Sequence, residues 1–187
     1  MRKLDRAGRL VVSSSELAAG SGTTAAQVRK DLSHFGSFGK RGHGYSVGDL
    51  RLRLRRILGL DRRWRVGVIG VGRIGSALLG YGLFAHRGFD VVAAFDADPT
   101  KVGRQFGGVE VLPLQSLEAE FADRDLSIAI IATPPDVAQD VAHRVISAGA
   151  SAILNFAPVK LDVPAGVALR TMDVTLELEG LSYMVTA

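Results

Sequence analysis

The sequence of 187 residues contains no cysteine and has only short apolar runs. Without cysteine the chain has no disulfide, no cysteine-ligated zinc and no thiolate nucleophile. The apolar runs at 66–69 and 128–132 fall far short of the roughly 20 residues of a membrane span, and no apolar signal-peptide core follows Met1. With 47% hydrophobic residues the chain can bury a sizeable core, so we expect it to be globular. The lack of cysteine, of a membrane span and of a signal-peptide core predicts a cytoplasmic protein with no membrane partner.

The net charge is only +4, but it is unevenly distributed along the chain. Residues 1–65 hold 15 Lys and Arg against 5 Asp and Glu, a net +10, whereas residues 66–187 hold 8 against 14, a net −6. This asymmetry predicts two domains with different partners, and the basic one favours a polyanion. A short polar bridge at 59–64 indicates a boundary near residue 62.

Residues 13–35 have the pattern of a helix-turn-helix. Ser13 and Glu16 have capping-box spacing, and Thr24 begins a second capped helix after a glycine-containing turn at 20–22. This second helix, expected to run to about Phe35, carries an apolar stripe that should be buried: Ala25, Val28, Leu32 and Phe35. Its other face suits bases and phosphates in a major groove, so we predict DNA contacts by Gln27, Arg29, Lys30, Ser33 and His34.

The glycine-rich, basic stretch 36–45 predicts a β-hairpin wing. Lys40 and Arg41 would lie at its tip, along the DNA backbone or in the minor groove, and Tyr45 is included among the predicted DNA-binding residues. Basic helices are often simply solvated, but the capped helices, the glycine turn, the wing and the positive charge together favour DNA. Residues 48–58 alternate in part like a strand but also have helical spacing, and we predict a helix.

Beyond residue 64, patterns typical of strands and helices alternate. We expect strands at 65–70, 90–96, 127–132 and 152–155, and helices at about 73–84 and 136–148. The alternation predicts an α/β fold with a Rossmann-like, doubly wound parallel sheet. The expected architecture is therefore an N-terminal winged helix-turn-helix domain at 1–62, followed by this nucleotide-binding domain at 63–172.

The run Gly70-Val71-Gly72-Arg73-Ile74-Gly75 has the G-x-G-x-x-G pattern of a dinucleotide site, and its six residues are predicted to bind the cofactor. The run follows a predicted strand and opens a predicted helix, which is the context that the pattern requires. Gly70 would make the tight turn, and Gly72 would let the backbone approach a pyrophosphate at the helix N-terminus. Gly75 would let the helix pack closely on the strand.

Residues at the ends of the other strands complete the predicted cofactor site. Asp96 would accept hydrogen bonds from the adenine ribose, which favours NAD(H) over NADP(H), although the basic Lys101 and Arg104 are near in sequence. Ligands of such sheets bind at the carboxyl ends of the strands, so two loops should line the nicotinamide half. They contain Thr133, Pro134, Asn155, Phe156, Ala157 and Pro158. In an alternative interpretation, the prolines merely end their strands.

The sequence has little room for catalytic chemistry. A dehydrogenase normally has a substrate domain and an acid or base, but the residues after 127 are consumed by the sheet and its helices. We expect none of the histidines to be catalytic or to bind a metal: His34, His43, His86 and His143. A nucleotide sensor is therefore favoured. The alternatives are an NAD-dependent oxidoreductase or CoA-ligase-type nucleotide-binding domain with a basic appendage, and a DNA-binding scaffold with a vestigial nucleotide site.

Several strings of residues resemble the Rex family of redox-sensing transcriptional repressors. They lie at 27–33, 38–42, 44–45, 95–99, 101–103, 153–158 and 173–178. The resemblance implies a homodimer that binds a palindromic operator in double-stranded DNA when NADH is scarce and releases it when NADH rises. NADH and NAD⁺ would act as ligands and not as redox cosubstrates, and no reaction would be catalysed.

The same resemblance implies further roles. Residues 173–187 would form a C-terminal helix that is exchanged between subunits, and Asp173 would change partners between the two states. Tyr81 would lie near the nicotinamide, and Lys101, which belongs to one of the similar strings, and Asp173 are also among the predicted cofactor-binding residues. His34 stands where the family often has a tyrosine, and Met1 falls within the family's first helix, so basic residues that precede this point in the family have no counterpart in this sequence.

Overall fold

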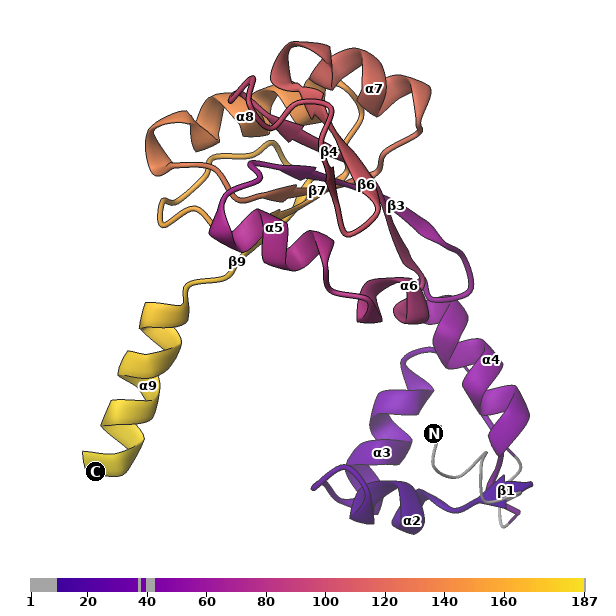
Figure 1. Cartoon of the computed structure of the whole chain (residues 1–187). Helices are drawn as coiled ribbons and strands as arrows, with labels where there is room; N and C mark the ends of the chain where they lie inside the picture. Colours follow the sequence, from indigo (N-terminus) through magenta and orange to yellow (C-terminus); the bar gives the residue numbers. More distant parts are fainter. Residues whose placement is uncertain (1–9, 37, 40–42, 187) are drawn as a thin grey trace. The chain divides into compact units, whose positions relative to one another are not determined.

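The computed structural model describes residues 10–36, 38, 39 and 43–186 (Figure 1). The chain divides into two compact units, Met1–Arg62 and Arg63–Ala187. Lys40 and Arg41, which the sequence places at the tip of a wing, lie outside the described residues. Within the described ranges, none of the helices combines the length and the apolar character needed to cross a membrane.

The N-terminal unit contains the predicted pair of capped helices. The Ser13 hydroxyl accepts the N–H of Glu16 at 3.2 Å, and the Glu16 carboxylate accepts the N–H of Ser13 at 2.8 Å. Thr24 accepts the N–H of Gln27 at 3.2 Å, so both predicted helix starts are confirmed. The elements of this unit are β1 (Val11–Val12), α2 (Ser14–Ala19), α3 (Ala25–Ser33), β2 (Tyr45–Ser46) and α4 (Val47–Ile57).

A small core holds the N-terminal unit together. Val12, Val47 and Leu50 are buried, and half-buried side chains from α2, α3 and the segment before β2 pack on them. Strand β1 pairs antiparallel with β2, and the ambiguous stretch 48–58 is helical as predicted. The prediction for Phe35 is wrong: α3 ends at Ser33, the chain turns at Gly36 with a φ of 113°, and Phe35 is 56% exposed.

The C-terminal unit is a seven-stranded sheet in the order β5-β6-β4-β3-β7-β8-β9. Six strands are parallel and β5 is antiparallel, which confirms the doubly wound fold. The chain starts at β3, builds outward on one side and then crosses to β7, so the order reverses between β3 and β7. The strands are β3 (Trp64–Ile69), β4 (Phe89–Asp96), β5 (Gln105–Phe106), β6 (Val109–Pro113), β7 (Ile128–Ile131), β8 (Ala152–Asn155) and β9 (Ala168–Thr171).

Helices cover both faces of this sheet (Figure 1). One core contains Phe121 of α7 and Val141 of α8 packed on Phe95 of β4, whereas the other contains Leu79 of α5 packed on Val68 of β3. The two clusters use alternate residues of the same strands, as the pleat requires. The helices are α5 (Arg73–Leu79), α6 (Leu83–Arg87), α7 (Leu117–Asp123), α8 (Pro135–Ser147) and α9 (Val174–Thr186).

The predicted helix at 73–84 is in fact two helices. Helix α5 ends at Leu79 with Gly80 as its C-cap, and α6 begins after Gly82. Two glycines within three residues weaken a helix because each has a large backbone entropy to lose. Tyr81 therefore lies in a turn and not on a helix. The elements α7, β5, β6 and β9 were not predicted.

We expect Glu118→Gln to lower the free energy of unfolding at pH 7, because it removes the ion pair with Arg144. The loss should be only about 1 kcal/mol, since Glu118 is 46% exposed and solvent screens the pair. The hydrogen bond from Arg144 lowers the pKa of Glu118 from 4.5 to about 2. The stabilisation is thus complete above pH 4.5 and is lost as the pH falls through about 2. Urea unfolding at several pH values should show the two proteins converging in acid; a constant difference would contradict this.

Candidate functional site

The loop 70–75 joins β3 to α5 at the carboxyl edge of the sheet, and two of its glycines are required by close contacts. Gly70 has a φ of 92°, and a Cβ there would lie 2.6 Å from the carbonyl oxygen of Ala132. A Cβ on Gly75 would lie 1.9 Å from the carbonyl oxygen of Gly70. The backbone geometry is therefore the one predicted for a tight turn at Gly70 and close packing at Gly75.

Gly72 is surrounded differently. A Cβ on Gly72 would meet nothing within 4 Å, and its φ of −83° is open to any residue. Gly72 is the N-cap residue of α5, and no side chain caps this end of the helix. Open space in front of unsatisfied helix N–H groups is the arrangement that binds phosphate in dinucleotide folds.

Thr133 provides a second indication that the edge fits a nucleotide. It follows β7, beside the glycine loop, since a Cβ on Gly70 would lie 3.0 Å from the backbone nitrogen of Thr133. In the described structure its Oγ1 is buried and has no hydrogen-bond partner. A buried hydroxyl without a partner is uncommon and calls for a ligand or water. Gly72 and Thr133 are thus the residues that would hold the dinucleotide phosphates.

Asp96, at the end of β4, is only 9% exposed. Its Oδ2 accepts the N–H of Val71 at 2.7 Å and the ammonium of Lys101 at 2.9 Å, and its Oδ1 accepts the N–H of Asp98 at 2.8 Å. Burial alone would raise the pKa of Asp96, but these hydrogen bonds outweigh it and hold the pKa below its usual range. A carboxylate has about four acceptor positions, so about one remains for a ribose hydroxyl.

Lys101 lies beside the carboxylate that is expected to recognise the ribose. Its ammonium binds Asp96 and lies 4.0 Å from the carboxylate of Asp98. No protein partner of Lys101 is predicted from the sequence, and the structure shows that its ammonium pairs with the carboxylate expected to recognise the ribose. The spacing of Asp96 and Lys101, five residues apart across a turn, is the signal that could have indicated this pair.

The loops predicted to line the nicotinamide half are at the ends of β7 and β8. Pro134 is exposed and precedes α8. After β8, Phe156 is half-buried, Ala157 is buried and Pro158 is exposed. Asn155 is fully buried, and its amide is hydrogen-bonded within its own loop. Direct contact of these residues with a nucleotide stays a prediction.

Two residues with roles implied by resemblance lie at element ends. Tyr81, between α5 and α6, is 51% exposed, and its ring meets Phe84 edge to face with centroids 5.1 Å apart. Asp173 precedes α9, and its carboxylate accepts the N–H groups of Thr175 and Leu176 at 2.9 and 3.3 Å. An acidic residue at this position stabilises the first turn of a helix.

The predicted DNA-binding side chains of α3 are exposed. Arg29 donates to the hydroxyl of Ser14 at 3.0 Å and so ties α3 to α2, and Gln27 donates to Asp31 at 2.5 Å. Ser33 and His34 both bond to the carbonyl of Lys30. Tyr45 is half-buried and packs on the small core, so its ring also has a structural role.

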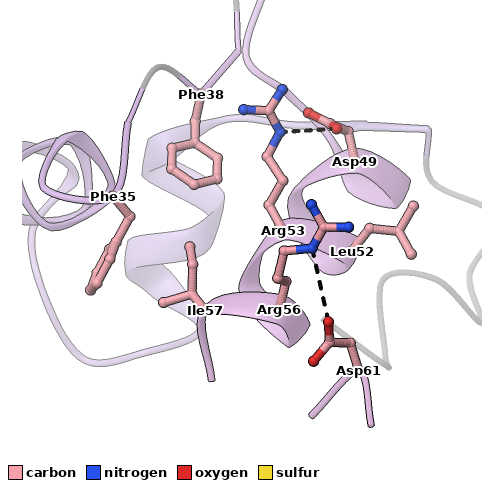
Figure 2. Close-up of a pocket in the computed structure, with 8 residues that line it drawn as sticks. All are labelled: Phe35, Phe38, Asp49, Leu52, Arg53, Arg56, Ile57 and Asp61. Atoms are coloured by element: carbon pink, nitrogen blue, oxygen red, sulfur yellow. Dashed lines mark hydrogen bonds and ion pairs between the residues drawn. The ribbon is translucent and has the colours of Figure 1, made fainter. Parts of the chain in front are cut away.

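A cavity of about 540 Å³ in the N-terminal unit was not expected from the sequence (Figure 2). Its apolar wall includes Phe35, Phe38 and Ile57. Its charged residues are paired: Arg53 binds Asp49 at 3.1 Å and Arg56 lies 3.9 Å from Asp61. Elsewhere, in the described ranges, no cluster of three or more His, Asp or Glu could hold a metal ion.

Comparison with known proteins finds matches to both parts of the chain. Family models match the C-terminal part, as "CoA binding domain" over residues 61–159, and the N-terminal part, as "Putative DNA-binding protein N-terminus" over residues 1–33. The redox-sensing transcriptional repressor Rex of Carboxydothermus hydrogenoformans is 47% identical over 183 residues, which are 98% of this chain and 88% of that protein. The chain belongs to the Rex family. Rex of Streptomyces coelicolor is 46% identical over 92% of this chain and 67% of its own length.

Solved structures of a Rex-family repressor, RSP, have the same fold. The complex of RSP with NAD⁺ and operator DNA matches with a TM-score of 0.93 and 37% identity, covering 98% of this chain and 85% of that one. The complex with NADH matches with a TM-score of 0.84 and 35% identity, covering 98% and 86%. The resemblance seen in the sequence and the predicted fold class are thereby confirmed. The relatives matched along nearly the whole chain are Rex repressors, although their nucleotide-binding fold is shared with dehydrogenases.

Proposed function

We propose that this Rex protein is a transcriptional repressor that senses the NADH/NAD⁺ ratio, binding operator DNA and releasing it when NADH rises. The observation that carries the proposal is the open space at Gly72 together with the unpartnered hydroxyl of Thr133, which adjoins the same glycine motif at Gly70, in a chain that also presents a capped, basic helix α3. NAD(H) is a ligand of this protein and not a redox cosubstrate, and no reaction is catalysed. The protein acts in the cytoplasm, where its operator is accessible.

The DNA-binding domain, residues 1–62, would place α3 in the major groove. Lys30 would contact phosphate, while Gln27, Arg29, Ser33 and His34 would reach base edges or backbone. Tyr45, Lys40 and Arg41 would act from the wing. A homodimer would read a palindromic operator with two recognition helices about 34 to 36 Å apart, one turn of the duplex.

Helix α9, in the segment 173–187, supports a homodimer with an exchanged helix. None of its residues is buried within the chain. Exposed apolar side chains lie along its whole length: Val174, Leu176, Leu178, Leu181, Tyr183, Met184 and Val185. Such a helix needs a partner surface, because a stable soluble helix normally buries an apolar face.

The nucleotide-binding domain, residues 63–172, would bind the phosphates at the glycine loop and the adenine ribose at Asp96, beside Lys101. The reduced nicotinamide would lie among residues 156–158, near Tyr81 and Val174 of the exchanged helix. An oxidised ring carries positive charge, and burying that charge in an apolar pocket is costly. NADH would therefore favour closure of the dimer more than NAD⁺ does, and Asp173 would exchange partners as α9 moves.

Titration of NADH against the operator complex tests this function. Saturating NADH should weaken operator binding by roughly 5- to 150-fold, the usual range of allosteric coupling, and DNA should weaken NADH binding by the same factor. NAD⁺ should have a smaller effect, and NADPH should bind more weakly because Asp96 repels a 2′-phosphate. Tight NADH binding with unchanged operator affinity, or steady oxidation of NADH with a small substrate, would contradict the proposal.

Lys30→Ala should weaken operator binding and reduce the slope of log affinity against log salt by about one. Lys30 is exposed on α3, so the substitution should leave the fold unchanged. Lys160→Ala, which removes an exposed lysine from the other unit, serves as the matched control. Fluorescence anisotropy at several salt concentrations measures the slopes. Equal slopes for the two variants would show that Lys30 does not contact phosphate.

A further inference from the structure

The side chain of Asn155 is turned away from solvent and into the loop that follows β8. Its Nδ2 donates to the carbonyl oxygens of Ala157 at 3.1 Å and Val159 at 2.9 Å, and its Oδ1 accepts the N–H of Ala157 at 2.9 Å. Both amide hydrogens are used, and Asn155 is 0% exposed. The amide therefore cannot reach a ligand unless the loop opens.

The peptide group between Asn155 and Phe156 connects the same loop to the ends of two neighbouring strands. The N–H of Phe156 donates to the carbonyl of Ile131 at the end of β7, at 2.8 Å. The N–H of Met172 donates to the carbonyl of Asn155, also at 2.8 Å. Met172 adjoins Asp173, whose carboxylate binds the first turn of α9. The peptide group that follows the side chain of Asn155 thus joins the loop 156–158 to the end of β7, which leads to Thr133, and to Met172, which precedes α9 by two residues.

We propose that Asn155 is a positioning residue for the nucleotide response. It holds residues 156–158 in the conformation that receives the nicotinamide, and it does not itself bind the nucleotide. This inference rests on the proposed function, because it assigns the loop to the nicotinamide half. It differs from the sequence prediction, in which Asn155 was one of the contact residues.

Asn155→Asp tests the proposal with a change of almost no volume. At pH 8 a carboxylate can only accept hydrogen bonds, so it faces the carbonyls of Ala157 and Val159 without a donor. If only about one tenth of the molecules then have residues 156–158 in the conformation that receives the nicotinamide, the NADH dissociation constant rises about tenfold. Burial raises the pKa of such a carboxyl, and its protonation restores one donor. The defect relative to the wild type should therefore shrink between pH 8 and pH 5.5, whereas operator affinity without nucleotide should stay unchanged.

Gln139→Glu is the matched control, because it makes the same chemical change at another amide that holds a loop. Gln139 on α8 donates to the carbonyl of Asp162 at 2.9 Å and accepts its N–H at 2.8 Å, outside residues 156–158. Its NADH affinity should stay within about twofold of the wild type at both pH values. An Asn155→Asp defect matched by Gln139→Glu, or one that is constant with pH, would overturn the proposal.

Hydrogen exchange on the wild-type protein gives a test that does not depend on any variant folding. The Ala157 amide should already be protected without nucleotide, because Asn155 has ordered the loop in advance. If the Ala157 amide exchanges as fast as an unprotected amide until NADH is added, the proposal is overturned. If the wild-type protein binds NADH and Asn155→Asp binds it equally well, the role of Asn155 is overturned but the proposed function is not. If the wild-type protein fails to bind NADH, the proposed function itself is overturned.

Discussion

Gly72→Val is expected to abolish the response to NADH while leaving the fold intact. The backbone at Gly72 is extended, and a Cβ there meets no protein atom within 4 Å, so the first atom of the new side chain introduces neither strain nor a clash. The new isopropyl group would instead occupy the space in which the pyrophosphate approaches the helix. We expect NADH affinity to fall by about a hundredfold, equivalent to about 2.7 kcal/mol, and operator binding without nucleotide to be unchanged.

Calorimetric titration and thermal unfolding of the same preparation check this result. Gly48→Val is the matched control, since a Cβ on Gly48 also meets nothing within 4 Å and Gly48 lies on α4, in the other unit. Its NADH affinity should equal that of the wild type. Gly75→Ala should behave differently from both, losing stability as well as binding, because its Cβ would overlap the carbonyl of Gly70. Normal NADH affinity in Gly72→Val would remove the glycine loop from the site.

Charging α9 is expected to have an equally large effect on operator binding. In a protein with both Leu178→Glu and Leu181→Glu, the isolated chain should keep its stability, because these leucines are 60% and 57% exposed and bury nothing within it. Burying a leucine contributes about 1.5 to 3 kcal/mol. Because a dimer contains these two leucines twice, dimer formation should weaken by at least about a thousandfold. Without the second, linked half-site contact, operator affinity should fall by about a hundredfold or more.

Sedimentation velocity and DNA-binding titration measure the two effects. Ser182→Glu adds one negative charge, half that of the double variant, to a polar position of the same helix and should change both quantities less. A double variant that stays dimeric at micromolar concentration would show that α9 does not form the subunit contact. Loss of thermal stability in the monomer would show instead that α9 packs on its own chain.

The glycine loop could be predicted residue by residue because each requirement is local. A tight turn, an open approach and a close helix contact each follow from the absence of a side chain, and the structure shows the corresponding geometry at Gly70, Gly72 and Gly75. The capped starts of α2 and α3 could be predicted for the same reason, since Ser13 and Thr24 act within three residues of their own positions.

Features that depend on distant parts of the chain could not be predicted. Strand β9 is stabilised by pairing with β8, and nothing in its four residues requires it. The prediction that Phe35 is buried was wrong because the spacing of apolar residues along a helix does not indicate where the helix ends. The inward orientation of Asn155 depends on the path of the whole loop, and the exposure of α9 depends on how the rest of the chain folds around it.

The pairing of Asp96 with Lys101 has a consequence for how the protein responds to ionic strength. The two side chains are 10% and 29% exposed, so dissolved ions screen their attraction weakly. Contacts between exposed arginines or lysines and phosphate are, by contrast, weakened steeply by salt. Nucleotide binding at Asp96 should therefore depend less on ionic strength than operator binding does.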